Sequence, residues 1–130
     1  MTQQDKDLLL RDLSARLPYK TLISFKKDND IYRLSDIDLN FKTINKIHII
    51  DDNYLPKPYL RPLSRLTQEE KDKFCDIGGV ISYRPTDGKQ YIVAFVPEAL
   101  DYLNSIHADY RGMIEKGLAI EVTDENNPYK

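Results

Sequence analysis

The sequence is poor in cysteine, tryptophan and glycine. It has one cysteine, Cys75, no tryptophan and five glycines among its 130 residues, and of these residue types only cysteine cross-links small folds. A single cysteine excludes an internal disulfide framework and any zinc site built from several cysteines. A chain of this length buries about two-thirds of the surface that it exposes when unfolded, so its core needs neither kind of cross-link.

Long hydrophobic runs are also missing. The first residues read Met-Thr-Gln-Gln-Asp-Lys-Asp and lead into only three consecutive leucines, whereas a secretory signal contains an apolar stretch of about 7–15 residues. No run approaches the roughly 20 apolar residues of a membrane-spanning helix. We therefore expect a cytoplasmic protein with no membrane partner.

Strong net charge of either sign is absent. The formal net charge is −2 and the pI is about 5.7, so no bulk field directs the chain to nucleic acid or to an anionic membrane. Residues 1–66 carry 12 Lys and Arg against 9 Asp and Glu, and residues 67–130 carry 7 against 12. This mild asymmetry is compatible with a basic face and with head-to-tail self-association.

What is present is the composition of one globular domain, which we expect to span residues 1–130. Thr2 and the Thr67–Glu70 capping box mark helix starts, Gly78 marks a helix end, and Asp87–Gly88 marks a hairpin turn. With the apolar spacing, these signals predict helices over 3–16, over 68–76 and from Pro97, and strands over 20–26, 31–34, 43–50, 80–83, 91–96 and 118–122. The strands fall into hairpins rather than strand–helix–strand units. The expected fold is α+β, with a mostly antiparallel sheet built from two hairpins and about three helices packed on it.

Two segments differ in kind from these elements. Residues 51–66 contain Pro56, Pro58 and Pro62, a density of proline that argues against a helix and against a central strand. Because the segment is also rich in Leu and Tyr, we expect an extended, polyproline-like connection that lies against the core. The polar residues 124–130 predict a frayed tail.

Three ordered stretches carry a resemblance. They are Leu13-Ser14-Ala15-Arg16-Leu17-Pro18-Tyr19, then Lys57-Pro58-Tyr59-Leu60-Arg61-Pro62-Leu63-Ser64 leading into Thr67-Gln68-Glu69-Glu70, and His107-Ala108-Asp109-Tyr110-Arg111-Gly112-Met113-Ile114 continuing to Gly117-Leu118-Ala119. Together they resemble a family of short uncharacterised proteins from Bacteroides-type gut bacteria and their phages or prophages. The resemblance implies a phage or mobile-element origin. It implies no reaction and no residue roles.

The first candidate binding segment is basic and contains an aromatic residue. Lys57, Arg61 and Arg65 could contact phosphates while Tyr59 stacks on a base. The same segment could instead be a docking strap for another protein. The third interpretation is structural: Tyr59 anchors the connection in the core and the three cations stay solvated.

The second candidate cluster joins His107, Asp109, Tyr110 and Arg111. A functional interpretation makes His107 an acid or base oriented by Asp109, with Arg111 binding an anion. The structural interpretation is a helix C-terminus, where Asp109 begins a turn and Arg111 pairs with a carboxylate. His48 is expected on the solvent face of a strand, and the lone Cys75 is expected to be a buried or half-buried structural thiol.

These observations favour a non-catalytic role. No phosphate-binding loop, dinucleotide-binding motif or nucleophile motif is present, and Asp28-Asn29-Asp30 lacks the Gly and Glu of a calcium loop. We predict no metal, no cofactor and no catalytic residue, and we leave open whether the chain is an enzyme. The first hypothesis is a phage or prophage module that binds another protein or itself. The alternatives are a nucleic-acid-binding accessory protein using residues 57–65, and an enzyme of unknown reaction centred on His107 and Arg111.

Overall fold

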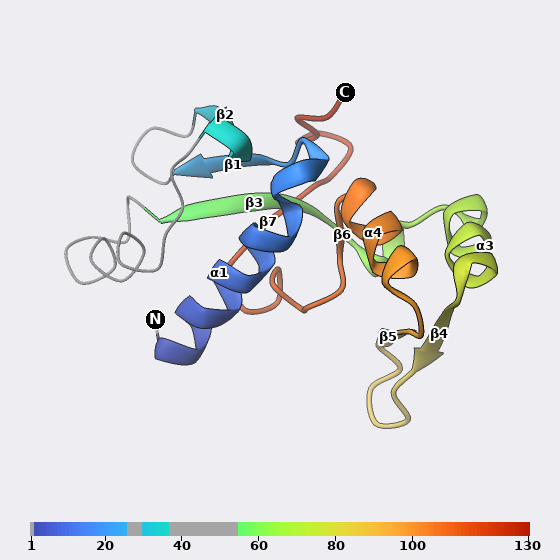
Figure 1. Cartoon of the computed structure of the whole chain (residues 1–130). Helices are drawn as coiled ribbons and strands as arrows, with labels where there is room; N and C mark the ends of the chain where they lie inside the picture. Colours follow the sequence, from blue (N-terminus) through green and yellow to red (C-terminus); the bar gives the residue numbers. More distant parts are fainter. Residues whose placement is uncertain (1, 26–29, 37–54) are drawn as a thin grey trace.

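The protein is described by a computed structural model (Figure 1) that covers residues 2–25, 30–36 and 55–130. Its elements are, in chain order, α1 (Gln3–Arg16), the 3₁₀ turn η1 (Leu17–Tyr19), β1 (Leu22–Phe25), β2 (Ile31–Arg33), η2 (Leu34–Asp36), β3 (Pro56–Pro62), η4 (Leu63–Arg65), α3 (Gln68–Ile77), β4 (Gly79–Tyr83), β5 (Gln90–Ala94), α4 (Pro97–Ser105), β6 (Ala108–Asp109) and β7 (Ile120–Glu121). The predicted strand over 43–50 lies outside the described residues, as does His48. The expected burial of Cys75 is wrong, because Cys75 is exposed on α3.

Helix α1 has the predicted boundaries. The Thr2 hydroxyl accepts a hydrogen bond from the Asp5 N–H at 3.1 Å, which caps the first turn. Pro18 follows the last turn and enforces the change to the 3₁₀ turn η1. Leu9 and Leu13 are fully buried one turn apart, so they form the stripe by which the helix packs on the sheet.

Strand β3 is the centre of the main sheet, whose strand order is β2-β1-β3-β6, with β7 also pairing with β3. The β1–β2 and β1–β3 pairs are antiparallel, and the pairs of β3 with β6 and with β7 are parallel. Together with the antiparallel β4–β5 pair, three of the five described strand pairings are antiparallel. The α+β class and the mostly antiparallel pairing are therefore confirmed.

The prediction that proline excludes a central strand at 56–62 is wrong, and the spacing of the prolines explains why. Alternate backbone N–H groups of a strand point to opposite edges. The Arg61 N–H donates to the His107 carbonyl on one edge, while the Leu60 carbonyl accepts from Val122 N–H on the other. Pro56, Pro58 and Pro62 occupy even-numbered positions, as Leu60 does. The backbone N–H groups that they lack would therefore point to the same edge of β3 as the N–H of Leu60. There β7 pairs only with Tyr59 and Leu60, between Pro58 and Pro62.

The second half of the chain begins with α3, whose capping box is present as predicted. The Thr67 hydroxyl accepts from Glu70 N–H, and the Glu70 carboxylate accepts from Thr67 N–H. The helix ends at Gly78, and Gly79 opens β4 directly against a buried ring: a Cβ on Gly79 would lie 2.1 Å from Phe74 Cζ. Side chains therefore cannot be added at this junction without displacing Phe74.

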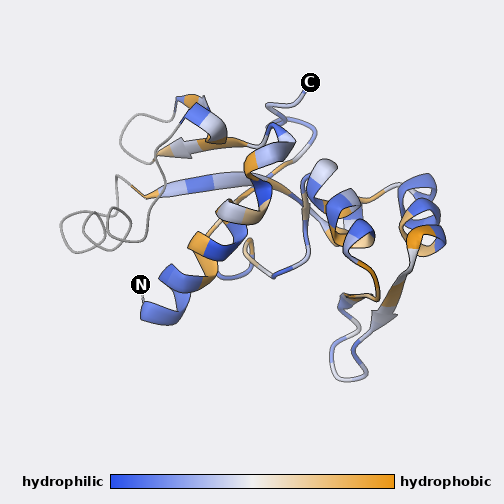
Figure 2. Cartoon of the chain, viewed as in Figure 1, coloured by the Kyte–Doolittle hydropathy of each residue, from blue (hydrophilic) through white to orange (hydrophobic). Residues whose placement is uncertain are grey.

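The β4–β5 hairpin forms a separate two-stranded sheet rather than part of the main one. It reaches away from the main sheet beside α3 and α4 (Figure 1). Its inner residues Ile81, Ile92 and Ala94 pack against a hydrophobic cluster centred on Phe74 and Leu103. A second cluster joins α1, β1 and β3 through Leu9, Leu13, Ile23, Leu60 and Met113. The core therefore has two apolar centres, and Figure 2 shows the hydrophobic segments in both halves of the chain.

Tyr129 connects the C-terminal segment, whose residues 124–130 the sequence predicts to fray, to the main sheet. The Tyr129 hydroxyl donates to the Tyr59 carbonyl at 2.7 Å and accepts from the Leu22 N–H at 3.1 Å. It thereby fills a gap in the hydrogen bonding between β1 and β3. The short strand β6, which the sequence analysis did not predict, pairs with β3 at Arg61 and Pro62.

Replacing Leu13 by alanine tests the packing of α1. Leu13 is fully buried, so Leu13→Ala should lower the free energy of unfolding by about 2–5 kcal/mol. Leu17, one turn further on and 38% exposed, is the matched control, and Leu17→Ala should cost well under this amount. Urea denaturation followed by circular dichroism measures both. Equal costs would contradict the packing described above.

Candidate functional site

One pocket collects residues from both clusters that the sequence singled out. It has a volume of about 320 Å³ and lies between the start of the C-terminal segment, the end of α4 and the edge of β3. Its lining comprises Arg61, Arg65, Ile106, His107, Val122, Thr123, Asp124, Asn127 and Tyr129. Arg61, Arg65 and His107 were predicted, whereas Tyr129 and the residues from 122 to 127 were not.

Arg61 is fully engaged inside the protein. Its two terminal nitrogens each donate to a Glu70 carboxylate oxygen at 2.7 Å, and they also reach the carbonyls of Ile106 and Arg65. The pair with Glu70 raises the pKa of Arg61 and lowers the pKa of Glu70. Because both terminal nitrogens of the guanidinium are hydrogen-bonded within the protein, Arg61 lines the pocket but is not free to bind an anion.

Arg65 is held less firmly. Its Nη2 donates to Asp124 Oδ1 at 2.8 Å, but the two side chains are 44% and 89% exposed. Ion pairs at such exposed positions contribute about 0–1 kcal/mol. An anion that enters the pocket can therefore replace Asp124 as the partner of Arg65 with little loss of free energy.

His107 lies at the inner end of α4 in an unusual environment. Its backbone has φ 61°, the left-handed region that is costly for a residue with a Cβ. The imidazole stacks on the Tyr129 ring with 3.9 Å between centroids and 8° between planes, and Nδ1 lies 3.4 Å from the Thr21 hydroxyl. Burial, together with the nearby charges of Arg16 and Arg61, lowers its pKa to about 4. His107 is thus neutral at neutral pH.

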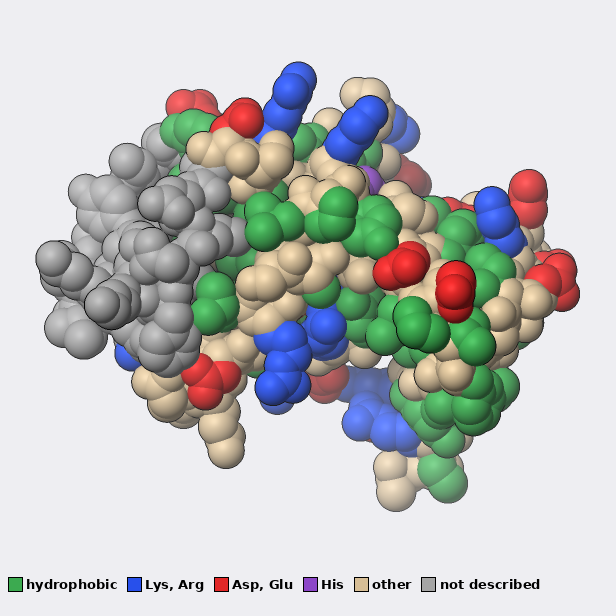
Figure 3. All heavy atoms as spheres, viewed as in Figure 1, with side chains coloured by type: hydrophobic (Ala, Val, Ile, Leu, Met, Phe, Trp, Pro, Cys, Tyr) green, Lys and Arg blue, Asp and Glu red, His purple; other side chains and the backbone are tan. Residues whose placement is uncertain are grey.

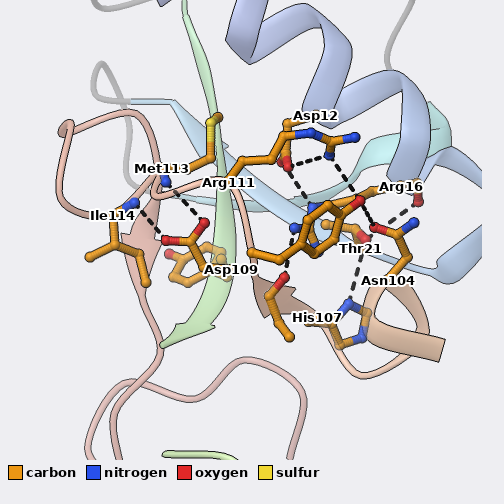
Figure 4. Close-up of polar contacts among 12 residues, drawn as sticks. Asp12, Arg16, Thr21, Asn104, His107, Asp109, Arg111, Met113 and Ile114 are labelled. Atoms are coloured by element: carbon orange, nitrogen blue, oxygen red, sulfur yellow. Dashed lines mark hydrogen bonds and ion pairs between the residues drawn. The ribbon is translucent and has the colours of Figure 1, made fainter. Parts of the chain in front are cut away.

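Beside the pocket, a buried polar network surrounds Asp12 (Figure 4). The Asp12 carboxylate accepts from Arg16 Nε at 2.8 Å and from Arg111 Nη1 at 2.9 Å. Arg16 also donates to the Ala108 carbonyl at 2.7 Å, and its guanidinium lies 5.1 Å from the Tyr110 ring centre. The structural interpretation of the second cluster therefore holds for Arg111, which pairs with a carboxylate from α1.

Tyr110 and Asp109 also have structural partners. The Tyr110 hydroxyl donates to Asn104 Oδ1 at 2.8 Å and accepts from Arg111 Nη1 at 2.9 Å. The Asp109 carboxylate accepts from the N–H groups of Met113 and Ile114, each at 2.9 Å. It points away from His107 in Figure 4, so Asp109 begins a turn and does not orient the imidazole.

The basic segment 57–65 does not form an exposed stacking platform. Tyr59 is buried, and its carbonyl is occupied by Tyr129. Arg61 is committed to Glu70, and Lys57 lies on β3 opposite Ser24. The arrangement differs from what base stacking beside phosphate contacts requires. Tyr59 lies in the core as the structural interpretation expected, but Arg61 is paired with Glu70 rather than solvated.

A different surface stands out by its exposure. On the outer face of the β4–β5 hairpin, Val80 lies opposite Val93, and Tyr91 and Phe95 continue the same face along β5 and beyond it. Phe95 is 71% exposed and the others are 39–44% exposed. In Figure 3, hydrophobic side chains gather over the hairpin at the lower right. We call Val80, Tyr91, Val93 and Phe95 the hairpin face.

Comparisons with protein-family models, with curated proteins and with solved structures found no match to this chain. Within residues 2–25, 30–36 and 55–130, no helix is long and apolar enough to cross a membrane.

The residues that sequence reasoning missed share one property: their role depends on distant partners. Asp12 and Arg16 lie four residues apart on α1, a spacing that allows an ion pair, but the sequence analysis did not single them out. Their complete burial depends on Arg111, Ala108 and Tyr110, about 90 residues away. Tyr129 lay in a polar tail and gave no local signal.

Replacing Tyr129 by phenylalanine tests the anchoring of the C-terminal segment. Tyr129→Phe removes the hydroxyl that joins the Leu22 N–H to the Tyr59 carbonyl, and should cost about 1–3 kcal/mol of unfolding free energy. Tyr83→Phe removes an exposed hydroxyl bonded to Gln90 and should be nearly silent. Thermal or urea unfolding compares the two variants, and an unchanged Tyr129→Phe would show that the hydroxyl does not bridge the strands.

The pKa of His107 gives a prediction with a definite sign. Because its folded pKa of about 4 lies below the ordinary value of 6.5, the unfolded chain binds the proton more tightly. The resulting stability is fully present above pH 6.5 and is lost as pH falls toward 4. His107→Asn keeps a residue that tolerates positive φ and should remove this part of the pH dependence. Unfolding measured between pH 7 and pH 4.5, with an NMR titration of His107, tests it; a pKa near 6.5 would contradict the burial.

Proposed function

We propose that the protein is a small non-catalytic protein-binding module that docks through the hairpin face. The exposure of Phe95, at 71%, is the observation that carries this proposal, because a large aromatic side chain gains most of its interaction energy when it leaves water. Three further apolar side chains lie beside it on the same two-stranded sheet. Contiguous exposed apolar patches of this kind mark interaction sites on soluble proteins.

The hairpin is built to present this face rigidly. Its inner side is fixed on α3 and α4 by Ile81 and Ile92. At its tip, Arg84 N–H donates to the Lys89 carbonyl, and Arg84 forms an ion pair with Asp87. A pre-ordered face loses little conformational entropy on binding, which supports a docking role.

The occupant that we favour is a second copy of the chain. None of the four side chains of the hairpin face is charged at neutral pH, so two copies can stack these faces about a two-fold axis without burying like charges. The largest apolar patch of a typical monomer is about 300–600 Å², below the roughly 800 Å² that each partner contributes to a standard interface. We therefore expect a weak dimer whose population depends on concentration.

The chemistry of the pocket supports the non-catalytic part of the proposal. Among its described lining residues, Arg61 is held by Glu70, Tyr129 uses its hydroxyl within the fold, and His107 has no carboxylate to orient it. The resemblance of the three ordered motifs to short phage and prophage proteins supports a mobile-element origin for the module. The buried position of Tyr59 disfavours the nucleic-acid alternative.

Phe95→Asp tests the docking face. The variant places a charge at the most exposed apolar position, and should shift sedimentation velocity or light scattering from a concentration-dependent dimer to a monomer. Tyr83→Asp is the matched control. Tyr83 is 60% exposed on the same hairpin, but it lies three residues from Val80 on β4 and therefore on the opposite face of the sheet. The Tyr83→Asp variant should still dimerise. A wild-type protein that stays monomeric at the highest soluble concentration would overturn self-association, and dimers that tolerate Phe95→Asp would place the interface elsewhere.

A further inference from the structure

We propose that the pocket between β3, α4 and the C-terminal segment binds a small polar hydroxycarboxylate. The pocket offers an imidazole nitrogen on its inner wall and separate N–H donors at its rim. A molecule that carries both a hydroxyl and a carboxylate matches this pattern. The inference is independent of the hairpin face, since the two sites share no residue.

The group on the inner wall is the His107 imidazole. Its Nδ1 lies 3.4 Å from the Thr21 hydroxyl, which also lies 3.4 Å from the Arg16 carbonyl. Among the described residues, Nε2 has no hydrogen-bond partner. A ligand hydroxyl both donates and accepts hydrogen bonds, so it can pair with Nε2 in either tautomer of the imidazole.

The donors at the rim are Arg65 and Asn127. The guanidinium of Arg65 is held only by the exposed carboxylate of Asp124, which occupies the place that a ligand carboxylate would take. The Asn127 side-chain oxygen accepts from Tyr129 N–H, and its amide nitrogen has no partner within the described ranges. Arginine and a primary amide together supply the N–H donors that a carboxylate prefers.

Arg65 is the charge that favours an anion over a neutral molecule, because Arg16 and Arg61 near His107 are already paired with Asp12 and Glu70. The positive φ of His107 is held from both sides, because its N–H donates to Asn104 and its carbonyl accepts from Arg61. Backbone strain that is over-determined in this way is common at ligand sites. The pocket volume of about 320 Å³ accommodates a small metabolite.

L-Malate and succinate form a matched pair of probes, since they differ only in the hydroxyl. Titrations of the ¹⁵N-labelled full chain should show saturable shifts at Arg65, His107 and Asn127 with L-malate, at a lower concentration than with succinate. No saturable shift with L-malate in the millimolar range would overturn the proposal. Equal affinity for the two acids would overturn the role of His107 as the partner of the ligand hydroxyl.

Two opposing variants locate the carboxylate. Asp124→Asn removes the internal competitor and should strengthen L-malate binding several-fold, whereas Arg65→Gln should abolish it. Asp87→Asn breaks a comparable exposed pair with Arg84 and should leave binding unchanged. Because Asp124 is 89% exposed, its variant retains the fold and remains informative. Unchanged binding in Asp124→Asn would exclude Arg65 as the carboxylate site.

Discussion

The structure depends on one buried carboxylate shared by two guanidinium groups. Asp12 on α1 binds Arg16 of the same helix and Arg111 beyond β6, while Arg16 reaches the Ala108 carbonyl. This network connects the apolar cluster under α1 to the one under α3 and α4. A buried charge that loses its partner costs about 3–5 kcal/mol, so the network fixes how α1 meets β6. One guanidinium nitrogen, Arg16 Nη1, is buried without a partner among the described residues.

The pocket and the hairpin face are supported by different parts of the protein. His107 lies between the end of α4 and Ala108. Because Arg16 donates a hydrogen bond to the Ala108 carbonyl, the Asp12 network also positions His107 on the inner wall of the pocket. The hairpin face lies on the far side of the second cluster and is supported by Phe74 and Leu103. Asp109, Tyr110 and Arg111, which the sequence analysis considered as candidate functional residues, therefore stabilise the fold. The exposed surfaces differ in character: the hairpin face is apolar, and the pocket offers hydrogen-bonding groups.

Local signals in the sequence predicted what is local in the structure. Thr2 and Thr67 set helix starts, Gly78 ended α3, and the Asp87–Gly88 turn closed the second hairpin, because each needs only neighbouring residues. The central position of β3 was not predictable from proline counts, since it depends on which edge of the strand each proline faces. For the candidate site, the sequence identified Arg61, Arg65 and His107 but not Tyr129, whose partners Leu22 and Tyr59 lie 107 and 70 positions away.

The partners of β3 have a consequence for how the chain reaches its native state. This strand pairs with β1 from early in the sequence, with β6 and β7 from late in it, and with the Tyr129 hydroxyl after both. Contacts of such long sequence separation slow the folding of small proteins, because loop-closure entropy is lost before they form. During synthesis on the ribosome, β1 and β3 therefore emerge before the Tyr129 hydroxyl that bridges them. The hydrogen bonding of the central sheet is completed only after the residues around Tyr129 have left the exit tunnel.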